Sequence, residues 1–146
     1  MKWLLFLAAA LSAQDQSGSK YFPLRQINVS NVGTLTQAWV YHTGDSLAPA
    51  KRGGRPPALE VTPLFVNETL YLSTPQGRVI ALDPETAKEK WTFDAKINRD
   101  AAYGDFANRG LGYANGRLYF GSIDARLFCL DAKTGRLCEG FATVDL

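Results

Sequence analysis

Glu60 and Arg109 are the two residues whose types and positions in this sequence point most directly to chemistry. Each stands immediately before a short apolar run, VTPL at 61–64 after Glu60 and GLGY at 110–113 after Arg109. An arginine in such a position suits a ligand carboxylate, because its planar guanidinium binds both oxygens at once. The spacing fits a second interpretation equally well, in which Glu60 and Arg109 pair with each other or with surface charges.

The single histidine, His42, lies beside Tyr41 in a run that has the composition of a strand. No second histidine and no cysteine cluster with metal-ligand spacing accompanies it, so the sequence predicts no zinc site and no metal ligand. One histidine alone also gives no basis for a His-dependent catalytic triad. We therefore expect a structural or surface role for His42.

The two cysteines, Cys129 and Cys138, flank the turn DAKTG in one predicted hairpin. In an oxidising compartment, an even number of cysteines this close together favours a disulfide. A strand pairing symmetric about Lys133, however, places Cys129 opposite Leu137 and leaves Cys138 one position out of register, whereas a bridge needs Cβ atoms within about 4.5 Å. The sequence leaves two outcomes open, a disulfide or two small buried thiols.

Asp83 and Asp131 are explained better as turn residues than as a catalytic pair. They begin the turns DPET and DAKTG, and an aspartate at the first position of a turn bonds to the backbone two residues on. Near the end of the second turn, Gly135 supplies a residue that tolerates a positive φ.

These residues belong to a stretch that occurs twice. Shifting residues 65–91 by 48 positions aligns them without a gap with residues 113–139, and the identities include Asn67 with Asn115, Tyr71 with Tyr119 and Asp83 with Asp131. A period of roughly 40–50 residues built from short β-type runs is typical of the blades of a β-propeller. The sequence therefore predicts an all-β fold, part of a propeller with about two four-stranded blades plus an N-terminal strand of a ring-closing blade.

The predicted domain organisation has three parts: a signal peptide at 1–13, an N-terminal strand and channel loop at 14–60, and two blades at 61–146. Because two blades cannot close a ring, we expect the blades to form an incomplete domain of a longer protein. The expected strands are 35–43, 61–64, 70–73, 78–82, 89–93, 111–113, 117–121, 126–130 and 136–141. The loops at 46–60 and 94–109 are the expected site-bearing segments.

Trp39 and Trp91 follow polar strand starts and are expected to wedge between neighbouring sheets, with the indole N–H bonded to a backbone carbonyl. In the second copy Glu139 takes this position, so the wedge there is missing or shifted.

Residues 1–13 have the composition of a short secretory signal peptide, in which Lys2 precedes an apolar run and small residues follow. We therefore expect a periplasmic or secreted protein, either free or associated with a membrane. The formal net charge is +2, and its basic residues are scattered among acidic ones. No block of like charge is present, so no nucleic-acid partner is indicated.

The order of motifs resembles the N-terminal part of the pyrroloquinoline quinone (PQQ)-dependent dehydrogenases, and most closely the quinoprotein glucose dehydrogenase type. The resemblance rests on YFPLRQINVSNVGTLTQAWVYHTGD, LEVTPLFVNETLYLSTPQGRVIALDPETAKEKWTFD, NRGLGY and DARLFCLDAKTGRLCEGF, and it covers residues 21–146. It implies an eight-bladed propeller that binds PQQ and Ca²⁺ and oxidises a sugar or an alcohol outside the cytoplasm. Ubiquinone or cytochrome c is the implied electron acceptor.

In that family a glutamate in the xExTPL context and an arginine in the NRG context contact the polar edge of the quinone, which implies these roles for Glu60 and Arg109. Alcohol-oxidising members often have adjacent cysteines shortly before NRG, where this chain has Tyr103-Gly104. This departure favours a sugar- or polyol-oxidising type. The resemblance places the catalytic base and the calcium ligands beyond Leu146, so we expect the 146-residue chain alone neither to bind PQQ tightly nor to turn over substrate.

A second hypothesis belongs to another class of protein, a non-enzymatic propeller of the same repeat type that acts as an assembly scaffold in the cell envelope. Such a scaffold retains the repeated turns, but it has no chemical reason to retain Glu60 and Arg109.

Overall fold

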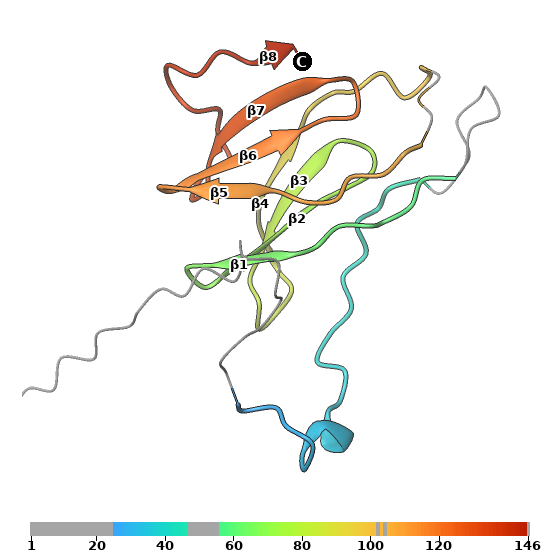
Figure 1. The fold of residues 1–146 in the computed structure, drawn as a ribbon, viewed down its shortest axis with the longest axis vertical. Helices are drawn as coiled ribbons and strands as arrows, with labels where there is room; N and C mark the ends of the chain where they lie inside the picture. Colours follow the sequence, from blue (N-terminus) through green and yellow to red (C-terminus); the bar gives the residue numbers. More distant parts are fainter. Residues whose placement is uncertain (1–24, 47–55, 102, 104, 146) are drawn as a thin grey trace, which may run out of the picture.

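The computed structural model describes residues 25–46, 56–101, 103 and 105–145. They form two four-stranded antiparallel sheets that lie face to face, one above the other in Figure 1. No α-helix occurs in these ranges, so the predicted all-β fold with two four-stranded units is confirmed. The predicted signal peptide at 1–13 and residues 47–55 of the predicted channel loop lie outside the described residues.

Each sheet is a meander in which consecutive strands pair. The first sheet contains β1 (Leu64–Val66), β2 (Thr69–Ser73), β3 (Arg78–Leu82) and β4 (Glu89–Asp94). The second contains β5 (Gly112–Ala114), β6 (Arg117–Gly121), β7 (Arg126–Asp131) and β8 (Val144–Asp145). A short 3₁₀ helix, η1 (Val32–Thr34), precedes both sheets.

The main core lies between the two sheets. Apolar side chains of both sheets form one buried cluster, with Leu64, Val66, Tyr71, Val79 and Ala81 from the first and Leu118, Phe120, Phe128 and Leu130 from the second. A smaller cluster of Leu72, Ile80 and Leu82 covers the opposite face of the first sheet, where Tyr41 and Val61 pack against it. Because β3 is buried on both faces, it reads RVIAL, a nearly continuous apolar run.

The prediction of a strand at 35–43 is wrong. This segment belongs to neither sheet, because it crosses the face of the first sheet instead of lining up along an edge where backbone groups could pair. Side chains hold it there: the Tyr41 ring packs on the smaller cluster and its hydroxyl donates to Glu89. His42 is exposed on this segment.

Trp39 and Trp91 make the same contact with successive sheets, as the sequence predicts. The Trp39 indole N–H donates to the Pro84 carbonyl over 3.0 Å, and the Trp91 indole N–H donates to the Ala132 carbonyl over 3.1 Å. Both acceptors directly follow the aspartate that begins the turn after the third strand of a sheet. Each tryptophan therefore joins one unit to the next.

A pair of arginines repeats this arrangement at the other end of the sheets. The Arg78 guanidinium donates to the Thr43 carbonyl, and that of Arg126 donates to the Ala95 carbonyl over 2.7 Å. Segment 35–46 thus makes the contacts toward the first sheet that β4 and Ala95 make toward the second.

The prediction of a strand at 136–141 is also wrong. Only an isolated bridge between Leu130 and Leu137 forms there, and the chain rejoins the sheet at β8. In the first sheet Val79 pairs with Phe93, 14 positions on, whereas in the second Leu127 pairs with Val144, 17 positions on. The three additional residues displace the fourth strand.

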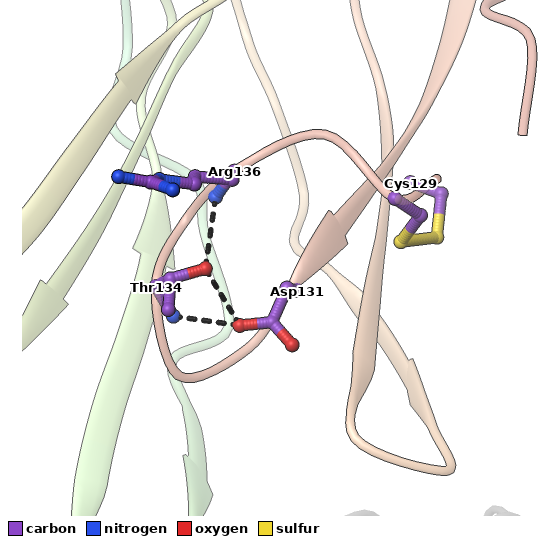
Figure 2. Close-up of a disulfide and its surroundings, with 5 residues drawn as sticks. Cys129, Asp131, Thr134 and Arg136 are labelled. Atoms are coloured by element: carbon purple, nitrogen blue, oxygen red, sulfur yellow. Dashed lines mark hydrogen bonds between the residues drawn. A yellow bond between two sulfur atoms is a disulfide. The ribbon is translucent and has the colours of Figure 1, made fainter. Parts of the chain in front are cut away.

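The turn between β7 and this displaced segment is closed by a disulfide and an aspartate (Figure 2). Cys129 and Cys138 are bridged, with their Cα atoms 5.4 Å apart, which decides between the two outcomes that the sequence leaves open. The bridge between Leu130 and Leu137 places the two cysteines opposite each other, so the register symmetric about Lys133 is wrong. Asp131 accepts hydrogen bonds from the Thr134 amide and hydroxyl, which confirms its role in the turn.

Candidate functional site

Glu60 and Arg109 lie side by side because their chain segments run parallel. Ala58 forms a parallel bridge with Ala107, and the Thr62 N–H donates to the Arg109 carbonyl over 3.1 Å. The two side chains meet, with 2.9 Å between a guanidinium nitrogen of Arg109 and Oε2 of Glu60. The structure therefore brings together the two residues that the sequence proposes for a site, and it pairs them with each other.

The pair is open to solvent. The Arg109 side chain is 78% exposed and that of Glu60 is 40% exposed. An ion pair in such a position contributes only about 0–1 kcal/mol, so a ligand carboxylate can compete for the guanidinium at small cost. Arg109 also retains donors beyond the one bonded to Glu60, since a guanidinium has five N–H groups.

Gly110 allows the two segments to approach each other this closely. Its φ is +141°, which side chains of L-residues rarely permit, and a Cβ at this position would lie 3.3 Å from the Thr62 carbonyl oxygen. A larger residue would move Arg109 away from the segment that contains Glu60.

Two other arginines at this end of the sheets are already occupied by internal partners. Arg78 pairs with Asp45 and Arg126 pairs with Asp124, and the arginine side chains are 22% and 28% exposed. Burial opposes ionisation of Asp124, but hydrogen bonds from Arg126 and Ser122 outweigh it and lower the pKa of its carboxyl. These two pairs stabilise the fold, which distinguishes them from the exposed Arg109.

The loop at 94–109, predicted to bear a site, contributes Arg109 and a supporting aromatic pair. Phe106 is buried in the core, and Tyr103 packs edge-on against it with ring centres 5.2 Å apart. Burial raises the pKa of the Tyr103 phenol. The aromatic pair therefore fixes this loop to the core close to Arg109.

Asn108 is a residue of the site that the sequence interpretation does not single out. Its side chain accepts hydrogen bonds from the Ser73 hydroxyl and the Gly110 N–H, and it donates to the Gly121 carbonyl over 2.8 Å. The only sequence signal for it is its position in NRG, next to the proposed ligand-binding arginine.

A pocket of about 440 Å³ lies at the opposite end of the sheets, between the turns that follow β1, β5 and β7. Its lining includes Tyr71 and Trp91, whose polar atoms both donate to the Ala132 carbonyl. Lys90, also in the lining, is bonded to Glu68 and Thr69. Arg109 is 78% exposed and retains N–H donors beyond the one bonded to Glu60, so the Glu60–Arg109 pair is the better candidate for a site.

In the part of the chain that the structure describes, no three His, Cys, Asp or Glu side chains gather where they could bind a metal ion. The same residues include no helix long and apolar enough to cross a membrane.

Comparison with known proteins identifies relatives along nearly the whole chain. A family profile described as "Glucose/ethanol/alcohol dehydrogenase, beta-propeller domain", of the PQQ type, matches residues 11–146. The quinoprotein glucose dehydrogenase of Escherichia coli K12 is 35% identical over 144 residues, which cover 88% of this chain and 18% of the relative. The dehydrogenase subunit of the alcohol dehydrogenase (quinone) of Gluconobacter oxydans is 40% identical over 134 residues, which cover 90% of this chain and 16% of the relative.

Solved structures give the same result. The quinohemoprotein alcohol dehydrogenase of Comamonas testosteroni superposes with a TM-score of 0.67 at 33% identity, over 84% of this chain and 17% of that chain. A europium-containing methanol dehydrogenase superposes with a TM-score of 0.63 at 32% identity, over 84% of this chain and 20% of that chain. The chain therefore spans less than a quarter of the length of each of these four proteins.

Proposed function

The chain belongs to the family of PQQ-type glucose, ethanol and alcohol dehydrogenases through their β-propeller domain, and on that basis we propose that Glu60 and Arg109 form part of a PQQ-binding site in an enzyme that oxidises a sugar or an alcohol. The family profile and the named relatives support the cofactor and the general class of substrate. Because the chain spans 18% or less of those two relatives, the activity of the complete enzyme is part of the proposal.

The observation that supports this proposal is the exposed Glu60–Arg109 pair between two adjacent blades. PQQ is a polycarboxylate, and the free N–H groups of Arg109 match a carboxylate in charge and geometry. The residues present therefore fit one polar edge of the cofactor. They do not fit a metal ion, because the described residues contain no cluster of three metal-binding side chains.

Within this site the residues of the chain would bind the cofactor and orient it. Arg109 would hold a carboxylate of the cofactor, and Glu60 would hold the guanidinium in place and accept a hydrogen bond from the cofactor edge. Bound PQQ would supply the acceptor for the hydride that leaves the substrate carbon. The base that takes the hydroxyl proton has no candidate at this site.

The remaining parts of the proposal rest on the resemblance and on the N-terminal sequence. We place the enzyme in the periplasm, because residues 1–13 have the composition of a signal peptide. The resemblance also implies a Ca²⁺ ion, which would supply Lewis-acid chemistry, but the described residues offer no cluster of three side chains to hold it. Ubiquinone or cytochrome c would receive the electrons.

A titration followed by NMR tests the site. PQQ added to the isotopically labelled chain should shift the amide signals of residues 58–62 and 106–110 in a saturable manner. Arg109→Gln should abolish these shifts, whereas the matched variant Arg117→Gln, at the exposed start of β6, should leave them unchanged. Shifts confined to the pocket lined by Tyr71, Trp91 and Lys90 would contradict the assignment.

A turnover assay tests the proposed incompleteness. The purified chain, supplied with PQQ, Ca²⁺ and glucose or ethanol, should not reduce an artificial electron acceptor, because the family resemblance assigns neither the catalytic base nor a calcium ligand to its residues. Steady dye reduction that requires PQQ would show that the chain is an active enzyme alone.

A further inference from the structure

Asn108 joins the two sheets at the end where Glu60 and Arg109 lie. Ser73, the last residue of β2, is completely buried and donates its hydroxyl to Oδ1 of Asn108. Nδ2 of Asn108 donates to the carbonyl of Gly121, the last residue of β6. One side chain therefore spans from the first sheet to the second.

The same side chain also fixes the backbone around Arg109. Oδ1 of Asn108 accepts a second hydrogen bond, of 3.1 Å, from the Gly110 N–H. The Arg109 carbonyl accepts from Thr62. Arg109 thus lies between Asn108 and Gly110, which are hydrogen-bonded to each other. Its own carbonyl is hydrogen-bonded to the segment that contains Glu60.

We propose that Asn108 is a positioning residue that holds Arg109 beside Glu60 and so presets the guanidinium for the cofactor. The inference rests on the proposed function, because it concerns the same site. Asparagine is suited to this role since its amide both accepts and donates hydrogen bonds. Aspartate of the same size retains the acceptor for Ser73 and Gly110 but cannot donate to Gly121, and alanine loses all three bonds.

Amide hydrogen exchange tests the positioning without any cofactor. Asn108→Ala should speed exchange of the Gly110 and Thr62 amides about fivefold, the factor expected for loss of one net hydrogen bond. Asn108→Asp should speed exchange less at Gly110, because that bond is retained. The control Asn98→Ala, which removes a side-chain bond to the Asp100 amide in the same loop, should leave Gly110 and Thr62 unchanged.

Ser73→Ala provides a second variant if Asn108→Ala does not fold, because it removes the bond to β2 and leaves the asparagine in place. It should speed exchange at Gly110 by a smaller factor than Asn108→Ala. Rates at Gly110 and Thr62 equal to those of Asn98→Ala in every folded variant would overturn the inference.

A PQQ titration of the same variants separates this inference from the proposed function. If both are correct, Asn108→Ala should weaken PQQ binding about fivefold, and Asn98→Ala should not change it. If the unsubstituted chain shows no PQQ-induced shifts at 58–62 and 106–110, the proposed function fails while the exchange rates still decide the role of Asn108. Unchanged PQQ affinity in Asn108→Ala, with binding otherwise at Arg109, would show that Asn108 supports the fold and not the site.

Discussion

Gly135→Ala is the substitution whose cost follows most directly from the contact between the two sheets. Gly135 has a φ of +71°, and an added Cβ would lie 2.5 Å from Cε3 of Trp91. The left-handed backbone conformation costs alanine about 1–2 kcal/mol, and forcing an additional methyl group against a packed ring costs about 1–3 kcal/mol. Together they predict a loss of about 2–5 kcal/mol, a large share of the roughly 5–15 kcal/mol that stabilises a typical domain.

Gly116→Ala is the matched control for this substitution. Gly116 has a similar φ of +77°, but an added Cβ would meet nothing within 4 Å, so only the backbone cost of about 1–2 kcal/mol applies. The backbone conformation alone is tolerable for alanine, since Ala87 adopts φ +57° at the position of the first copy that is equivalent to Gly135.

Equilibrium urea unfolding followed by circular dichroism measures both variants against the unsubstituted chain. We expect Gly135→Ala to lose about 1–3 kcal/mol more than Gly116→Ala. If the two losses agree to within about 0.5 kcal/mol, the ring contact contributes nothing and the reasoning is refuted.

Two further predictions concern the disulfide and Tyr41. Replacing Cys129 and Cys138 together by alanine removes a link with a sequence separation of 9. In urea titrations this change should lower the free energy of unfolding by about 2–3 kcal/mol. A reductant should destabilise the unsubstituted chain by a similar amount, and a reductant without effect would contradict the prediction. Burial and the hydrogen bond to Glu89 raise the pKa of the Tyr41 phenol to about 12. Because this pKa is raised above the ordinary value of 10.0, the stability it contributes is complete below pH 10 and is lost as the pH rises from 10 toward 12. Glu89→Gln should lower the Tyr41 pKa. This pKa is measured by following, against pH, the difference in phenolate absorbance between chains with Tyr41 and with Tyr41→Phe. An unchanged pKa would mean that the Glu89 carboxylate has no effect.

Strands that pair with their neighbours in sequence are predictable here, and contacts between distant segments are less so. The predicted bounds 78–82 and 117–121 coincide with β3 and β6, because turn residues and apolar runs define them locally. The fourth strand of the second sheet is wrong in the prediction, since an exact 48-residue shift cannot accommodate the three additional residues before Val144. Segment 35–43 has the β-favouring composition of a strand, but composition does not report whether a partner strand lies alongside.

The closeness of Glu60 and Arg109 is predictable, but their pairing with each other is not. Their positions shortly before the first strand of each sheet indicate that Glu60 and Arg109 lie close together, and the structure confirms this. Sequence spacing cannot show whether the two side chains are exposed, so it leaves a mutual pair and a ligand site equally open. Asn108 is not predictable, because two of its three hydrogen bonds end on residues of different sheets, Ser73 and Gly121.

The repeated tryptophan contact gives the assembly of this chain a direction. In both contacts the earlier segment of the chain presents an indole and the later sheet presents a turn carbonyl, so the contact is head-to-tail, as in heterologous assemblies of subunits. The two contacts join residues 45 and 41 positions apart. The entropy lost in closing a loop grows only with the logarithm of its length, so both closures cost nearly the same. The two contacts that join successive parts of the chain therefore have nearly equal entropic cost.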